Sequence, residues 1–83
     1  MKILFSKHAL LQMEERGATR SEVVKAVEYG EEIPAKKGRI AFRYNLQFTG
    51  SWLGKRFRMK QIKPIVVKEN SHYIVVTVYV FYF

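Results

Sequence analysis

The feature that most restricts the fold is a strict alternation of apolar and polar residues in the second half of the chain. Between residues 39 and 48, every second position is apolar: Ile40, Phe42, Tyr44, Leu46 and Phe48. Residues 55–62 repeat the pattern, and Phe57 and Met59 are expected to point inward there. Because successive side chains of a strand point to opposite faces, both segments are predicted to be strands with one face on a core.

The remaining residues of this half complete a predicted meander. Residues 49–54 are expected to form a loop, and Pro64 to mark an edge, a bulge or a break because proline cannot donate to a ladder. A strand resumes at Ile65–Lys68, a turn follows, and Tyr73–Phe83 is predicted to be the last strand. Its aliphatic even-numbered positions are expected to face the helices.

The first thirty residues carry helix signals instead. Ser6 and Gly17 are a plausible N-cap and C-terminal stop for a helix over Lys7–Arg16. Residues 19–22 form a capping-box pattern that opens a second helix, about Arg20–Tyr29. Residues 1–30 are therefore expected to form a helical hairpin.

The chain of 83 residues is long enough for one small domain with one modest core. The predicted fold class is α+β, with two N-terminal helices packed on one face of a three- to four-stranded antiparallel sheet. The single domain spans residues 1–83, divided into the helical hairpin and an antiparallel meander over residues 31–83.

Charge is unevenly distributed between the two halves. Residues 1–32 hold five Lys or Arg against six Glu, whereas residues 33–83 hold ten Lys or Arg against one acid, Glu69. The formal net charge is +8 and the isoelectric point is near 10.0. Nucleic acid is the first partner class to consider, before an anionic membrane surface or an acidic protein; simple solubility is the alternative explanation.

Five of these cations are expected to share the sheet face opposite the helices and to bind nucleic-acid phosphates: Arg39, Arg43, Arg56, Arg58 and Lys60. Tyr73, Thr77 and Tyr79 of the last strand would lie beside them, where aromatic rings suit unstacked bases. The alternatives are a solvated strand face, and a last strand buried on both sides by a dimer or by the loop.

The segments Phe5-Ser6-Lys7-His8-Ala9-Leu10, Met13-Glu14-Glu15-Arg16-Gly17 and Val75-Val76-Thr77-Val78-Tyr79 resemble the DUF4258 family. Domains of this type occur as small stand-alone proteins and at the toxin ends of bacterial polymorphic toxins. The family has been proposed to belong with RelE-like and barnase-like folds that include metal-independent ribonucleases. The resemblance therefore implies a RelE-like fold and a role in binding or cleaving RNA.

Metal-independent cleavage of RNA requires proton transfer at the ribose 2′-oxygen and the leaving 5′-oxygen, and stabilisation of the phosphorane charge. The catalytic candidates are His8 for proton transfer, Arg16 and Arg58 for the phosphate, and Tyr79 as proton donor or stacking platform. Structural roles are the alternatives for each. His8 and the sheet cations would form one site only if the first helix packs at the margin of the sheet.

Other chemistries are poorly supported. With two His and no Cys, the chain has no metal motif, and no cofactor is expected. It shows no signal-peptide pattern and no apolar run long enough for a membrane-spanning helix, so a cytoplasmic protein without membrane contact is the expectation. The expected partner is RNA; an acidic antitoxin protein and a homodimer through the C-terminal strand are the further partners considered. Three functions remain open: a ribonuclease toxin, a non-catalytic nucleic-acid-binding module, and a protein-interaction domain.

Overall fold

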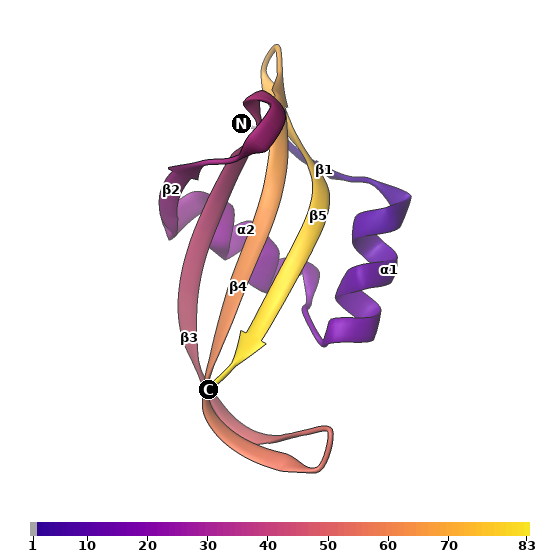
Figure 1. Cartoon of the computed structure of the whole chain (residues 1–83). Coiled ribbons are helices and arrows are strands. Elements are labelled where there is room, and N and C mark those ends of the chain that lie inside the picture. Colours follow the sequence, from indigo (N-terminus) through magenta and orange to yellow (C-terminus); the bar gives the residue numbers. More distant parts are fainter. Residues whose placement is uncertain (1) are drawn as a thin grey trace.

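The computed structural model describes residues 2–83 and contains two helices packed against a five-stranded mixed sheet (Figure 1). The helices and strands follow one another along the chain as β1 (Lys2–Phe5), α1 (Lys7–Arg16), α2 (Arg20–Tyr29), β2 (Glu31–Pro34), the short 3₁₀ helix η1 (Lys36–Gly38), β3 (Ile40–Trp52), β4 (Lys55–Glu69) and β5 (His72–Tyr82). The order across the sheet is β1-β5-β4-β3-β2. The predicted α+β class is confirmed, with more strands than expected.

Strands β1 and β2 are the additions. β1 pairs in parallel with the start of β5, and β2 pairs antiparallel with β3. Each is only four residues long, too short to show a clear alternation of its own. The partner of β1 also lies at the other end of the chain, so no local pattern could have predicted this pairing.

The two helices have the predicted bounds and the predicted ends. The Ser6 side chain accepts a hydrogen bond from the Ala9 N–H at 3.0 Å, and Thr19 and Glu22 form the reciprocal capping box. Gly17 ends α1 in the left-handed region, at φ 79°. A Cβ at Gly17 would lie 2.6 Å from the Tyr82 hydroxyl oxygen, so glycine is required there by space as well as by backbone conformation.

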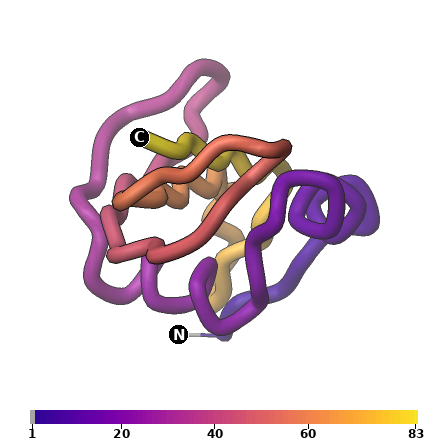
Figure 2. The backbone as a smooth tube through the Cα atoms, turned by 90° about the horizontal axis from the view of Figure 1, so that it is seen from below, coloured from indigo at the N-terminus to yellow at the C-terminus, as the bar shows by residue number. Residues whose placement is uncertain are grey.

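The helices occupy different places on the sheet. α2 lies behind β3 and β4 and covers one face, whereas α1 packs along β5 (Figure 1). Viewed from below, α1 stands to one side of the β3–β4 hairpin (Figure 2). The face turned toward the viewer in Figure 1 carries neither α-helix. We refer to it below as the open face.

The core lies between α2, α1 and the opposite sheet face. Its buried residues include Val23 and Ala26 of α2, Met13 of α1, and Ile62 and Val66 of β4. A bulge in β5 determines which residues reach this core, because Val66 pairs with Val75 while Ile65 pairs with Thr77. Val76 is thus an extra residue that reverses the alternation along β5.

The bulge makes the predicted placement of Tyr73 wrong. Tyr73 packs against the core, with its ring edge-on to Phe42 at a centroid distance of 5.8 Å, instead of lying beside the cations. Val78 and Val80 face the core as predicted, whereas Thr77 and Tyr79 remain on the open face. No feature of the alternating pattern in residues 73–83 marked the position of the bulge.

The β3–β4 hairpin also differs from its prediction. The strands extend to Trp52 and from Lys55, so the predicted loop is reduced to Leu53 and Gly54, with φ of 51° and 80°. Two successive positive φ angles are typical of a two-residue hairpin turn. β4 continues through the buried Pro64, so no strand break occurs there. The register shift with β5 lies directly after it, between Ile65 and Val66, which agrees with the bulge among the predicted alternatives.

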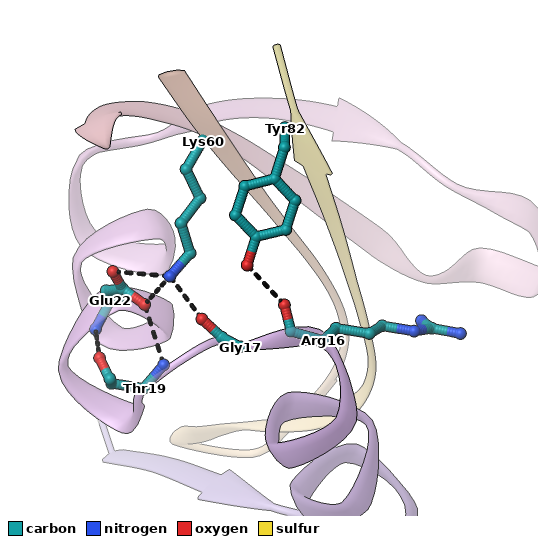
Figure 3. Close-up of polar contacts among 6 residues, drawn as sticks. All are labelled: Arg16, Gly17, Thr19, Glu22, Lys60 and Tyr82. Carbon is teal, nitrogen blue, oxygen red and sulfur yellow. Dashed lines mark hydrogen bonds and ion pairs between the residues drawn. The ribbon is translucent and has the colours of Figure 1, made fainter. Parts of the chain in front are cut away.

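The register of this hairpin places Lys60 on the helix side of the sheet, which contradicts the prediction that it lies on the open face. Lys60 pairs with Leu46 and Tyr82 and is only 5% exposed. Its Nζ donates to both carboxylate oxygens of Glu22, at 2.8 and 3.0 Å, and to the Gly17 carbonyl oxygen (Figure 3). These hydrogen bonds of Lys60 therefore connect β4 to the junction between α1 and α2.

Tyr82 completes the same junction. Its hydroxyl donates to the Arg16 carbonyl oxygen at 2.8 Å (Figure 3), and its ring stacks on Trp52 at a centroid distance of 5.0 Å. Burial, and to a smaller degree the nearby Glu22 carboxylate, raise the pKa of the Tyr82 phenol above its ordinary value of 10.0. At neutral pH the phenol is therefore protonated and can donate this hydrogen bond.

We expect Lys60→Met to lower the free energy of unfolding by about 2–4 kcal/mol, because it leaves the Glu22 carboxylate and the Gly17 carbonyl without their cation. Adding Glu22→Gln should recover part of this loss, since glutamine also fits a capping box. Lys63→Met, on the same strand but on the open face, should change stability by no more than about 0.5 kcal/mol. Chemical denaturation measures all three; equal losses for Lys60→Met and Lys63→Met would contradict the assignment.

Candidate nucleic-acid interface

The open face of the sheet is formed by residues that the strand register places side by side. Lys63 of β4 pairs with Tyr79 of β5, and Ile65 pairs with Thr77. On the other side of β4, Ile65 pairs with Ala41 of β3. Because cross-strand partners share a face, Lys63, Ile65, Thr77 and Tyr79 lie together on the open face, next to the buried Ala41.

A hollow of about 400 Å³ lies on this surface. It is lined by Ala35, Lys36, Lys37, Arg39, Lys63, Ile65, Thr77 and Tyr79, which we call the basic groove. Four of these side chains are cationic, and none of the described residues that line the hollow is acidic. The groove is thus a concave, positively charged surface with hydroxyl groups from Thr77 and Tyr79.

A tight turn brings three of these cations to the groove. Lys37 has a left-handed backbone, with φ 62°, and Gly38 follows with φ 71°. The Ala35 N–H donates to the Arg39 carbonyl at 2.9 Å and closes the turn. The chain therefore folds back at η1 and carries Lys36, Lys37 and Arg39 to one wall of the hollow.

Arg16 lies next to the groove because α1 closes the edge of β5. The Val78 N–H donates to Gln12 Oε1 at 2.9 Å, and Arg16 Nη1 donates to the Val78 carbonyl at 2.8 Å. The Arg16 guanidinium lies 5.5 Å from the centre of the Tyr79 ring, in a cation–π arrangement. Two of the predicted catalytic residues, Arg16 and Tyr79, are therefore neighbours.

His8 is not part of this arrangement. It is exposed in the first turn of α1, on the same helix stripe as Gln12 and Arg16, and it does not line the groove. α1 does pack at the sheet margin, as a joint site would require, but the end of the stripe that meets Tyr79 is Arg16.

The five predicted phosphate-binding cations are separated by the structure. Arg39 lines the basic groove, whereas Arg43 forms an ion pair with Glu31 of β2. Arg56 and Arg58 are exposed in the distal hairpin and line a separate hollow of about 250 Å³ with Thr49, Gly50 and Phe57. Lys60 is buried against Glu22 and is not available to an external anion. The prediction that all five share one face is wrong.

Three of the four groove cations were not among the predicted ligands: Lys36, Lys37 and Lys63. Lys36 and Lys37 lie outside the alternating segments, residues 39–48 and 55–62, on which the phosphate-binding prediction was based. Lys63 belongs to the odd-numbered positions of β4, which the alternation of residues 55–62 had assigned to the core side. The prediction thus assigned the two faces of β4 the wrong way round. It put Lys60 on the open face and did not consider Lys63 as a ligand.

Two further observations concern the part of the chain that the structure describes. Within residues 2–83, no three His, Cys, Asp or Glu side chains come together in a way that would hold a metal ion. None of the helices among these residues has the length and apolar character needed to cross a bilayer.

Comparison with known proteins gives a family and no function. Neither the curated proteins nor the solved structures contain a match to the chain. The family model described as "Domain of unknown function (DUF4258)" matches residues 5–80, and this range includes the helices, the basic groove and most of β5. The chain therefore belongs to the DUF4258 family.

Proposed function

We propose that this protein is directed at RNA and that the basic groove holds its phosphodiester backbone. The observation that carries the proposal is the convergence of four cations without an acid in one hollow of the open face. Lysine binds phosphate as a mobile point charge, and arginine binds it through paired donors, so the two types together suit successive phosphates of one strand.

The pairing of the other charges supports this choice of surface. Lys60 is neutralised by Glu22 and Arg43 by Glu31, so neither offers a full free charge to a ligand. The groove cations Lys36, Lys37 and Lys63 have no carboxylate partner among the ion pairs of the described residues. The groove thus presents cations that form no ion pair with the described carboxylates, on the uncovered face of the sheet.

Binding to a single-stranded oligonucleotide should weaken steeply with salt, with a log–log slope of about −0.7 per phosphate contacted. Lys63→Gln should weaken binding and reduce the slope by about 0.7, because it removes one phosphate contact. Lys25→Gln, an exposed lysine on α2, is the matched control and should leave both unchanged. Fluorescence anisotropy at several salt concentrations measures both quantities. A slope near zero, or equal effects of the two variants, would contradict the proposal.

A second candidate function is metal-independent cleavage of the bound RNA, the activity expected of a RelE-like toxin. The specific observation that favours it is the position of Arg16 over Tyr79, next to Lys63. In such cleavage the ribose 2′-oxygen passes its proton to water and attacks phosphorus, and the bond from phosphorus to the 5′-oxygen breaks as that oxygen takes up a proton. In this proposal Tyr79 donates the proton to the 5′-oxygen, while Arg16 and Arg39 stabilise the charge on the phosphorane oxygens.

We expect the wild-type protein to cleave total RNA in the presence of EDTA, and Tyr79→Phe to slow cleavage by about 100-fold or more, because the phenolic proton is lost. His8→Ala and Arg58→Ala should retain most of the activity, since neither residue lines the groove. Gel analysis of the products measures the rates. Absence of cleavage by the wild type would remove the catalytic function and leave the binding function in place; loss of activity in His8→Ala would move the site to α1.

The toxin role also implies an acidic antitoxin partner. A polyanionic protein segment would be attracted to the same groove and would compete with RNA for it.

A further inference from the structure

The open face carries aromatic side chains in addition to its cations. Tyr79, Phe81 and Phe83 occupy alternate positions at the end of the chain and are 43%, 47% and 56% exposed. The rings of Tyr79 and Phe81 lie nearly parallel, with 19° between their planes and 6.4 Å between their centroids. We call these three residues the aromatic stripe. Since Tyr79 also lines the basic groove, the stripe and the groove are continuous.

On the opposite face of β5, by contrast, the aromatic residue Tyr82 is covered by other side chains. Tyr82 is packed between Trp52, Phe48 and Phe57, at centroid distances of 5.0, 5.0 and 5.7 Å. The fold therefore gathers aromatic rings on one side of β5 and leaves them uncovered on the other. An exposed aromatic surface that adjoins a charged groove is typical of a binding site rather than of an unused surface.

We infer that the aromatic stripe stacks unpaired bases of the same RNA whose phosphates lie in the basic groove, so that the ligand is single-stranded RNA. The inference rests on the proposed function and adds the ligand's strandedness and the residues that select it. Aromatic platforms on a sheet bind bases through their π faces and tolerate many sequences, since every base has such a face.

The spacing of the rings favours a single strand over a duplex. Alternate residues of a strand lie about 6.5–7 Å apart, which is about twice the 3.4 Å step of stacked bases. Bases in a duplex keep that step and turn their faces toward one another, so they cannot offer them to the protein. A flexible single strand can separate its bases and place one on each ring. An acidic polypeptide would satisfy the cations and gain nothing from π faces.

Binding of 2′-O-methyl oligonucleotides, which cannot be cleaved at the 2′-oxygen, tests the inference. The probes are a single-stranded uridine octamer, an abasic octamer with the same phosphates, a blunt duplex, and polyglutamate of matched charge. The variants are Phe81→Ala, Phe81→Leu, and the control Tyr29→Ala, an exposed aromatic of α2. Thermal melting confirms that each variant is folded.

Phe81→Ala and Phe81→Leu should both weaken binding of the uridine octamer by about 5- to 150-fold, the range expected for one lost base stack. Neither should affect the abasic octamer, and Tyr29→Ala should affect no probe. The wild type should bind the duplex and polyglutamate more weakly than the octamer.

Three results would overturn the inference: unchanged octamer binding by both Phe81 variants, equal binding of duplex and single strand, or equal binding of polyglutamate. If the octamer remains sensitive to Lys63→Gln in the first of these cases, the proposed function stands and only the stacking role fails. If the wild type binds no oligonucleotide at all, the proposed function itself fails.

Discussion

The free edge of β5 is the constraint on which the arrangement of the site depends. β1 pairs only with the first residues of β5, so the backbone groups beyond them need other partners. The Ser6 N–H donates to the Val75 carbonyl, and the Gln12 and Arg16 side chains then bind the N–H and carbonyl of Val78. α1 must therefore lie along this edge, and as a consequence the open face stays uncovered and Arg16 stands beside Tyr79.

Two polar side chains of α1 have a structural role because they bind the backbone groups at this edge. Gln12 is buried because it replaces a backbone acceptor, and Arg16 uses one guanidinium nitrogen on Val78. The remaining donors of Arg16 are directed by that contact, which holds the guanidinium near the Tyr79 ring. The same residue thus contributes to the stability of the fold and to the charge of the candidate site.

The sequence predicted local structure well and the relative phase of the strands poorly. The bounds of both helices follow from Ser6, Gly17 and the capping box, which act over one turn and are visible in the chain. The face of Lys60 depends on the register shift between Gln47 and Gly50 of β3, and the face of Tyr73 depends on the bulge at Val76. Both are determined by pairing between strands and not by the local pattern. Alternation shows that two faces differ; it does not show which of them meets the helices.

The basic composition therefore has two different roles in this molecule. Lys60 is a structural cation that is buried and paired with Glu22 at the helix junction. Because it alternates with apolar residues along the sequence, it was predicted to lie on the open face. The groove cations lie on the other face of the sheet from Glu22. A high isoelectric point alone would not distinguish the two roles, whereas the strand register does.

The ligand is proposed to lie on the open face of the sheet, and an NMR titration with the 2′-O-methyl octamer would locate it residue by residue. We expect the largest backbone amide shifts at Lys37, Lys63 and Tyr79, while the amides of α2 remain unchanged. Shifts confined to α2, or to the distal hairpin around Arg56, with no change in the groove, would contradict it.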